Sequence, residues 1–247
     1  ECELEIACNQ RGRILALRGQ AWVNTGAYIR TTAASPPRNI AQVLSGPYRI
    51  ENIHIDVGLL VSNKAPSGTY RAPGRFEADF FRERLLDLAA RDLGLDRVAF
   101  RRRNLITEAE MPWPLATVMP MKNCSQCDSG DYQITLDRCL KEFDWPAKIK
   151  LEGKIFNGRY HGFAVGCYLE GTGSGKEWAR LVLEDSGTVS VAVGSSSIGQ
   201  GVETVFAQIV GDALDLPIAR IGQVGHGSTN LLTDGGGSFS SRSTVMA

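Results

Sequence analysis

The chain has 247 residues, in which 27 lysine and arginine residues balance 27 aspartate and glutamate residues. Because the net charge is zero and no block of like charge stands out, the composition favours neither a nucleic-acid partner nor a membrane surface. No apolar run reaches the roughly 18 to 20 residues that a membrane helix requires. The six cysteines follow no disulfide pattern, which is typical of a reduced, cytoplasmic protein.

The first 110 residues predict strands that alternate with helices. In chain order, the pattern of apolar side chains predicts a hairpin over 3–24, a strand over 53–61, a helix from about Phe76 to a cap at Gly94, and a helix from Asp96 to about Asn104. Arg101, Arg102 and Arg103 fall at the end of this last helix, where cations suit the helix dipole. We expect all three side chains to be exposed and solvated.

The pattern weakens between residues 111 and 157, where several prolines predict an irregular connection. Cys124 and Cys127 have CxxC spacing, but no second pair of metal ligands follows, so a polar surface turn is expected. Beyond this turn, the sequence predicts a helix over 132–143 with Cys139 packed inside it, strand residues at 166–169, a hairpin over 181–193 and a helix from Val202 that ends before Pro217.

The order of these elements favours a mixed α+β fold with two related modules, each with strands or a hairpin followed by a glycine-rich turn and a helix. We expect a first domain over residues 1–110, an irregular connection over 111–157 and a second domain over 158–247. The chain opens without a methionine, inside an alternating run, and stops where a helix is expected to start. We therefore interpret it as a segment of a longer polypeptide.

Three turns rich in glycine or serine lie at residues 67–74 (SGTYRAPG), 194–201 (GSSSIGQG) and 235–241 (GGGSFSS), the first two directly before a predicted helix. Helix N-termini leave backbone N–H groups unpaired, glycine allows close approach to an anion, and serine hydroxyls add donors. Three such turns suggest a large, polyanionic organic cofactor.

None of these three turns carries a known catalytic or nucleotide-binding sequence motif. Neither serine turn completes the G-x-S-x-G nucleophile elbow, no Walker lysine follows a turn, and the dinucleotide fingerprint lacks its third glycine. Metal-ligand spacings are absent as well. This combination is typical of an enzyme whose cofactor carries the reaction.

Five motifs give the chain a resemblance to a known family. They are YRAPGRFE at 70–77, RRRNLI at 101–106, IGQGVET at 198–204, AQIVGD at 207–212 and GSFSSRST at 237–244. In this order they resemble motifs of the molybdenum-binding large subunit of the xanthine oxidase family, which includes aldehyde oxidases and carbon monoxide dehydrogenases. The chain departs from the family pattern at Ala72 and Phe76, where relatives carry glycine and proline.

The resemblance implies two molybdopterin-binding modules and a molybdenum–molybdopterin cofactor, which in this family is often the cytosine dinucleotide form. It assigns cofactor binding to Tyr70, Arg71, Ala72, Ile198, Gly199, Gln200, Gly237, Ser238, Ser240, Ser241 and Ser243. The backbone at Arg71 and Ala72 would lie near the molybdenum. Pro73 and Asn39 would belong to the substrate pocket, and the small, rigid Pro73 predicts an open space rather than a slot for stacking on a purine.

The family activity implied is hydroxylation of an aldehyde or an N-heterocycle, with water as the oxygen source and electrons passed to 2Fe–2S and FAD partner domains or subunits. The assembled enzyme is expected to be a dimer. The catalytic glutamate of the family belongs beyond this segment, so we assign no catalytic residue or metal ligand here and expect the segment alone to be inactive. Glu170 is expected to line or support the pocket.

Two alternatives remain open at this point. One is a non-catalytic cofactor-binding or assembly scaffold of the same fold. The other is a thiol-redox or metal module built on Cys124 and Cys127.

Overall fold

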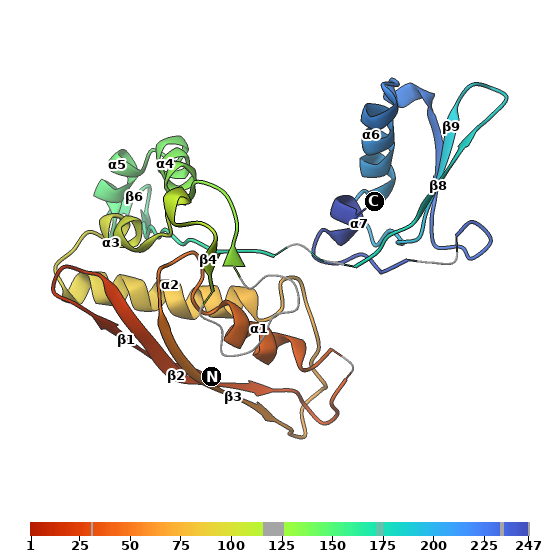
Figure 1. Cartoon of the computed structure of the whole chain (residues 1–247). Coiled ribbons are helices and arrows are strands. Elements are labelled where there is room, and N and C mark those ends of the chain that lie inside the picture. Colours follow the sequence, from red (N-terminus) through yellow and green to blue (C-terminus); the bar gives the residue numbers. More distant parts are fainter. Residues whose placement is uncertain (31, 116–125, 172, 174, 233–234, 247) are drawn as a thin grey trace. The chain divides into compact units, whose positions relative to one another are not determined.

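The computed structural model describes residues 1–30, 32–115, 126–171, 173, 175–232 and 235–246. It contains two compact units, an N-terminal unit of Glu1–Leu169 and a C-terminal unit of Glu170–Ala247 (Figure 1). Among the described residues, no helix is long and apolar enough to cross a membrane.

The N-terminal unit is built on a three-stranded sheet with the order β1-β2-β3. Strand β1 (Cys2–Cys8) pairs antiparallel with β2 (Ile14–Asn24), and β3 (Asn52–Leu60) pairs parallel with β2. A parallel neighbour requires a crossover, and helix α1 (Ser35–Val43) lies within it. Two prolines start α1, where their fixed φ suits the first turn and no N–H is needed.

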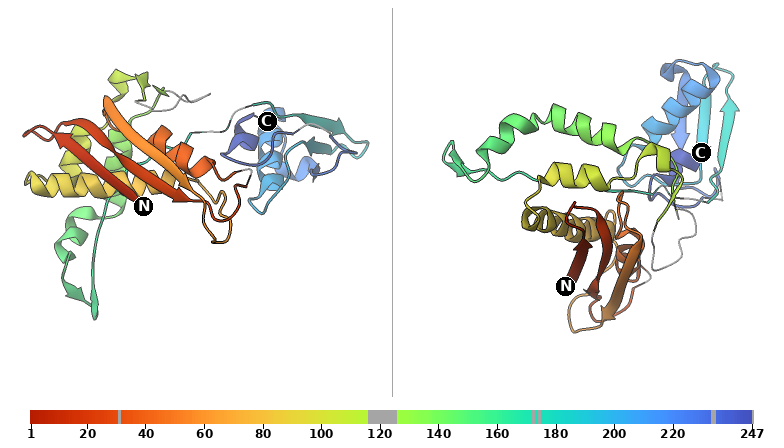
Figure 2. Two further views of the ribbon diagram at one scale, coloured as in Figure 1. Left: turned by 90° about the horizontal axis from the view of Figure 1, so that it is seen from below. Right: turned by 60° about the vertical axis from the view of Figure 1, so that its left-hand side comes forward.

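Helices cover one face of this sheet, with α1 and the long helix α2 (Arg75–Asp92) beside each other (Figures 1 and 2). Helix α3 (Arg97–Asn104) packs against α2 and closes the core. The core residues are Ile14, Leu17 and Ala21 of β2, Ile55 of β3, Ile40 and Ala41 of α1, Ala78, Leu86 and Ala90 of α2, and Phe100 of α3. Burial of this apolar surface, at about 25 cal/mol per Å², holds the helices on the sheet.

A series of short elements completes the N-terminal unit. They are η1 (Glu108–Glu110), β4 (Trp113–Pro114), β5 (Gln126–Cys127), α4 (Tyr132–Glu142), α5 (Trp145–Lys148), η2 (Ile149–Leu151), β6 (Ile155–Phe156) and β7 (Arg159–Tyr160). Residues 162–171, which follow β7, form a run without regular secondary structure. Alternate side chains of this run, Phe163, Val165 and Cys167, pack on the core.

The C-terminal unit has a smaller three-stranded sheet with the order β10-β9-β8. Strands β8 (Ala179–Leu183) and β9 (Val189–Val193) form an antiparallel hairpin, and β10 (Ile221–Gly225) pairs parallel with β9. The crossover contains α6 (Val202–Leu214) and η3 (Ile218–Arg220), and α7 (Arg242–Met246) follows β10. Three valines of β9 pack with Val202, Phe206 and Val210 of α6 and with Ile221 of β10.

The two units repeat one order of elements: an antiparallel hairpin, a crossover helix, and a third strand parallel to the second. Helix α6 therefore takes the place that α1 takes in the N-terminal unit. In this order of elements, the turn at 194–201 links β9 to α6 and corresponds to the link between β2 and α1. The turn at 67–74 lies between β3 and α2 and corresponds to the turn between β10 and α7.

The predicted mixed α/β architecture is confirmed, as are both hairpins and the helices α2, α3, α4 and α6. Three expectations are wrong. Residues 166–169 form no strand, because no neighbouring strand pairs with them. Cys139 is exposed on α4 instead of packed, and Cys127 is buried in β5 instead of lying in a surface turn. Cys124 lies outside the described residues.

Candidate functional site

Helix α1 holds the predicted loop at residues 70–74 in place. The chain turns left-handed at Ala72 (φ 52°) and Gly74 (φ 76°). A Cβ on Gly74 would lie 2.1 Å from the carbonyl oxygen of Pro36, so only glycine fits there. Asn39 of α1 is 7% exposed, and its Nδ2 donates a hydrogen bond to the Pro73 carbonyl at 2.7 Å. The structure thus joins Asn39 and Pro73, with Asn39 supporting the loop from inside.

A second set of contacts ties the chain before this loop to the end of β2. Thr25, which is fully buried, donates its backbone N–H to Leu60 and accepts a backbone hydrogen bond from Ser67. Gly26 (φ 77°) packs against Ala65, whose oxygen would lie 2.3 Å from an added Cβ. The predicted residues Tyr70 and Arg71 follow this anchored stretch and are exposed. A rigid base therefore presents both side chains to solvent.

In the C-terminal unit, the loop at 195–201 is fixed by a hydrogen bond at its buried first residue and is exposed toward its other end. Its buried residue Ser195 donates from Oγ to Glu177 Oε2 at 2.8 Å. Gly199 (φ 102°) and Gly201 (φ 80°) have no atom within 4 Å of an added Cβ, and Ile198 is 78% exposed. The Ile198 N–H donates to Gln200 Oε1 at 2.7 Å, which leaves the Gln200 amide N–H groups available to a ligand.

His226 also fixes this loop, a role that the sequence analysis missed. The Ser197 N–H donates to His226 Nδ1 at 3.3 Å, so the other ring nitrogen carries a hydrogen and contacts Glu203 Oε1 at 2.7 Å. A backbone hydrogen bond at Glu203 itself and the contact with His226 lower the pKa of the Glu203 carboxyl. Because His226 follows β10 and Glu203 lies in the first turn of α6, only the crossover brings them together.

The third turn, at 235–241, lies against the second. A Cβ on Gly235 would lie 2.1 Å from the Gly194 oxygen, and Ser238 Oγ donates to the Ser196 oxygen at 2.5 Å. Ser240 (φ 47°) and Ser241 (φ 56°) both adopt the left-handed backbone, which non-glycine residues rarely do. The structure therefore brings together the predicted residues of the two turns within this unit.

Ser243, another predicted binding residue, has a buried Oγ with no hydrogen-bond partner among the described residues. A buried hydroxyl without a partner costs about 1–3 kcal/mol, so a site of this kind favours a ligand atom that can bond to it. Together with the open backbone at Gly199 and Gly201, this hydroxyl fits a ligand rich in oxygen acceptors. The residues present fit a phosphate-bearing organic cofactor.

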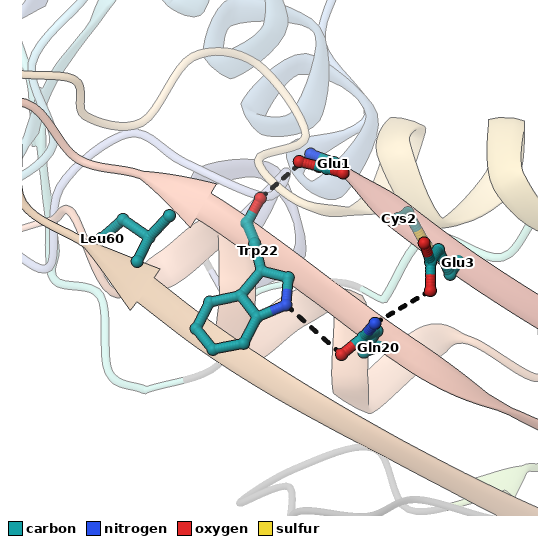
Figure 3. Close-up of a pocket in the computed structure, with 6 residues that line it drawn as sticks. All are labelled: Glu1, Cys2, Glu3, Gln20, Trp22 and Leu60. Atoms are coloured by element: carbon teal, nitrogen blue, oxygen red, sulfur yellow. Dashed lines mark hydrogen bonds between the residues drawn. The ribbon is translucent and has the colours of Figure 1, made fainter.

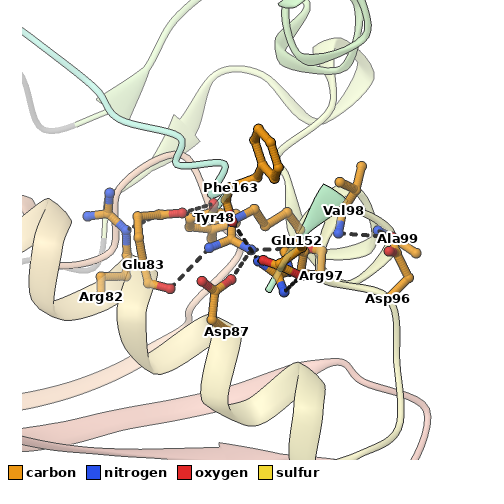
Figure 4. A network of polar contacts seen from close by, with 11 residues as sticks. Tyr48, Arg82, Glu83, Asp87, Asp96, Arg97, Val98, Ala99, Glu152 and Phe163 are labelled. Atoms are coloured by element: carbon orange, nitrogen blue, oxygen red, sulfur yellow. Dashed lines mark hydrogen bonds and ion pairs between the residues drawn. The ribbon is translucent and has the colours of Figure 1, made fainter. Parts of the chain in front are cut away.

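A buried ion-pair network between α2 and α3 corrects the expectation for the three arginines. Arg101 is fully buried: its Nε contacts Glu83 Oε2 at 2.8 Å and its Nη1 contacts Asp87 Oδ1 at 2.7 Å. Figure 4 shows the Glu83 and Asp87 carboxylates within this network, with Arg82 and Tyr48 close by. Burial by itself would lower the pKa of Arg101, but the charges of Glu83, Tyr48 and Asp87 and the hydrogen bond to Glu83 together outweigh it and raise that pKa. Arg102, one residue further, remains partly exposed.

The same network reaches the segment that leaves the N-terminal unit. Arg82, also fully buried, contacts Glu83 Oε1 at 3.0 Å and donates from Nη2 to the Cys167 carbonyl at 2.8 Å. Tyr48 donates its hydroxyl to Glu83 at 3.0 Å, and burial followed by the Glu83 charge raises the pKa of Tyr48 well above its usual value. These groups are structural. The exposed Glu170 follows this segment, at the start of the C-terminal unit.

A hollow on the N-terminal sheet contains none of the predicted site residues. It is lined by Glu1, Cys2, Glu3, Gln20, Trp22 and Leu60 (Figure 3). Within it the Trp22 ring covers Gly58, where an added Cβ would lie 2.1 Å from the ring. The hollow is thus a product of sheet packing.

Comparison with known proteins gives the family. Two family models, both described as a molybdopterin cofactor-binding domain, match residues 1–105 and 138–247. Subunit gamma of the 6-hydroxypseudooxynicotine dehydrogenase complex of Paenarthrobacter nicotinovorans is 37% identical, in an alignment of 247 positions that covers 99% of this chain and 31% of that protein. The carbon monoxide dehydrogenase large chain of Hydrogenophaga pseudoflava is 28% identical, and the matched region covers 98% of this chain and 32% of that protein.

The fold agrees with a solved relative. Quinoline 2-oxidoreductase from Pseudomonas putida 86 superposes with a TM-score of 0.75 at 26% identity, over 98% of this chain and 32% of that one. The chain thus spans 31–32% of the length of these relatives. Since the two family models together span most of the chain, it belongs to the molybdopterin cofactor-binding family, as a segment of the kind found in the molybdenum-binding subunits of xanthine oxidase-type enzymes.

Proposed function

We propose that this chain holds a molybdenum–molybdopterin cofactor in an enzyme that hydroxylates an N-heterocycle or an aldehyde with water as the oxygen source. When bound, the cofactor supplies the two-electron redox chemistry, and we propose that 2Fe–2S and FAD partner domains or subunits accept the electrons. The observation that carries this proposal is the pair of adjoining turns in the C-terminal unit: the Ser243 hydroxyl is buried without a partner among the described residues, and an added Cβ at Gly199 or Gly201 would meet no atom within 4 Å.

Within the C-terminal unit, we assign the pterin to residues 198–200 and the phosphate oxygens to residues 237–243. The Gln200 amide has donor capacity left after its oxygen accepts from Ile198. Ser240, Ser241 and Ser243 supply hydroxyls, whereas the Ser238 hydroxyl already donates to the Ser196 oxygen and joins the two turns. The left-handed backbone at Ser240 and Ser241 favours an anion-binding nest of N–H groups. Nucleotide released together with the pterin would distinguish a cytosine dinucleotide form of the cofactor from a form with a single phosphate.

In the N-terminal unit, we propose that Tyr70, Arg71 and Ala72 contact the molybdenum end of the cofactor. Support comes from the anchored base of this loop, since the tie from Asn39 to Pro73 fixes its shape without the ligand. A loop with a fixed shape positions a reactive group without a reordering cost. Pro73 offers no aromatic face, which favours a compact or elongated substrate over a stacked purine.

The substrate class rests on the small Pro73 side chain and on the names of the relatives. One solved relative acts on quinoline, an N-heterocycle. We therefore place an N-heteroaromatic ring first and an aldehyde second. The assembled enzyme is proposed to be a dimer.

The first experiment measures molybdenum and pterin in the purified full-length protein, with nucleotide released by mild acid as the readout for a dinucleotide form. We expect near-stoichiometric molybdenum and pterin. Ser243→Ala removes one hydroxyl from a charged ligand and should lower cofactor affinity roughly 10- to 100-fold. Ser186→Ala, in the hairpin turn between β8 and β9, is the matched control and should retain the cofactor. A folded protein with neither molybdenum nor pterin would overturn the proposal.

The second experiment supplies quinoline-type rings and aldehydes in isotopically labelled water under anaerobic conditions with an artificial electron acceptor. Incorporation of label from water into the product supports hydroxylation of this type. Label entering only from dioxygen would contradict it.

A further inference from the structure

Glu177 and Arg242 form an ion pair that is buried on both sides. Their side chains are 0% and 1% exposed, and Arg242 Nη1 lies 2.5 Å from Glu177 Oε2. Neither residue belongs to the predicted cofactor-binding set. They lie far apart in the sequence, one just before β8 and the other at the first residue of α7.

Each member of the pair holds backbone or side-chain groups of the two turns. Glu177 Oε2 also accepts from Ser195 Oγ at 2.8 Å and from the Gly236 N–H at 3.4 Å. Arg242 donates to the Gly237 carbonyl at 3.1 Å. The ion pair therefore joins the turn after β9 to the turn before α7 through hydrogen bonds to both.

Arg242 also fastens this connection to the sheet. Its Nη2 donates to the Lys176 carbonyl at 2.5 Å, beside Glu177 and just before β8. Its guanidinium lies under Gly236, where an added Cβ would be 2.1 Å away, and over the Phe239 ring at 5.7 Å. Packing against Arg242 therefore favours glycine at position 236, whether or not a ligand binds there.

The two carboxylate oxygens of Glu177 differ in their number of hydrogen-bond partners, and a gain in folding stability does not explain this difference. Oε2 has three partners, whereas Oε1 is buried with none among the described residues. Burial by itself would raise the pKa of this carboxyl, but the hydrogen bonds from Ser195, Arg242 and Gly236 lower it, so the group is ionised. A buried ion pair with an unsatisfied atom is costly, and packed apolar residues commonly stabilise a fold as well or better.

We propose that Glu177 and Arg242 are positioning residues that set the spacing of the turns at 195–201 and 235–241, and so the fit of the cofactor between donors on these two turns. This inference rests on the proposed function. Neither side chain is required to touch the cofactor, because both act through Ser195, Gly236 and Gly237.

The test uses the full-length holoenzyme and three variants of graded severity. Glu177→Gln keeps the size but not the charge, Arg242→Lys keeps the charge but not the planar fork, and Ser195→Ala removes one hydrogen bond and should fold in any case. Arg220→Lys is the matched control, since Arg220 donates to the Gly187 carbonyl at the far end of the hairpin.

Two readouts separate positioning from simple loss of fold. The first is amide hydrogen exchange of the two turns in cofactor-free protein, which we expect to be about tenfold faster in Glu177→Gln and Arg242→Lys while the exchange of β9 and α6 is unchanged. The second is the rate of cofactor loss and the Mo(V) electron paramagnetic resonance spectrum of the retained cofactor. We expect release about tenfold faster and a broadened signal, with a smaller effect for Ser195→Ala and none for Arg220→Lys.

The failures can be told apart. If the wild-type protein holds no molybdenum or pterin, the proposed function fails. If it holds both and the variants release them at the wild-type rate with unchanged exchange of the turns, the positioning role alone is refuted. Equal acceleration of exchange in the turns and in β9 would refute it as well, since that is the signature of a global loss of stability.

Discussion

Replacing Arg101 by methionine removes the cation at the centre of the network between α2 and α3. Its guanidinium makes four hydrogen bonds, to Glu83 Oε2, Asp87 Oδ1, the Glu83 carbonyl and the Arg97 carbonyl, and the side chain is fully buried. Removing one partner of a buried ion pair costs about 3–5 kcal/mol, because a buried charge is left uncompensated. Glu83 keeps Arg82 and Tyr48 as partners, so we expect the lower end of that range.

Arg102→Met is a closely matched control for this change. It alters the next residue of the same helix by the same substitution, so differences in helix propensity cancel. The side chain of Arg102 is 40% exposed and that of its partner Asp137 is 50% exposed, and pairs of this kind contribute about 0–1 kcal/mol. We therefore expect Arg101→Met to lower the free energy of unfolding by about 2–3 kcal/mol more than Arg102→Met.

The assay is urea unfolding of the purified protein, followed by far-UV circular dichroism and by the fluorescence of a tryptophan in the N-terminal unit. The slope of each transition must remain unchanged between variants for the free energies to be compared. A difference of less than about 1 kcal/mol between the two variants would refute the reasoning, because it would mean that the buried cation is no more valuable than the exposed one.

Two further predictions concern the turns. Gly74→Ala and Gly94→Ala both place alanine at a positive φ, which costs about 1 kcal/mol of stability in each case. Only at Gly74 would the added Cβ also meet the Pro36 oxygen, at 2.1 Å, so Gly74→Ala should lower the free energy of unfolding in urea by about 1–3 kcal/mol more than Gly94→Ala. Equal losses in the two variants would contradict this packing argument. The pKa of Glu203 is lowered first by its own backbone hydrogen bond and then by the contact with His226. The ionised carboxylate therefore stabilises the loop fully above the ordinary glutamate value of about 4.3, and this contribution is lost as pH falls through the lower folded value. The NMR shift of the Ser197 amide should follow that titration, and Glu203→Gln should abolish it; a shift that still titrates in the variant would assign the effect elsewhere.

Local patterns in the sequence determined much of the fold and the position of the turns. Asp96 and Asp131 cap α3 and α4 with side-chain hydrogen bonds to N–H groups two or three residues ahead, so the signal lies within a few residues. The hairpin of β8 and β9 follows from alternation around a short turn, and Gly94 ends α2 in the left-handed conformation. The motifs at 70–77 and 198–204 likewise pointed to the family, which the family models confirm.

Only the tertiary structure decided which arginine is buried and which groups hold the turns. Arg101 and Arg102 are identical in type and adjacent, yet one is buried against two carboxylates of α2 and the other pairs with Asp137 at the surface. Strand β10 pairs parallel with β9 because the crossover helix returns the chain to the start of the sheet. The sequence of Ile221–Gly225 alone only weakly predicts a strand. The pairing of Glu177 with Arg242 spans 65 residues and leaves no periodic trace in the sequence. A local pattern reports the conformation of neighbours along the chain, whereas burial and ion pairing depend on residues that meet only after the strands and helices have packed.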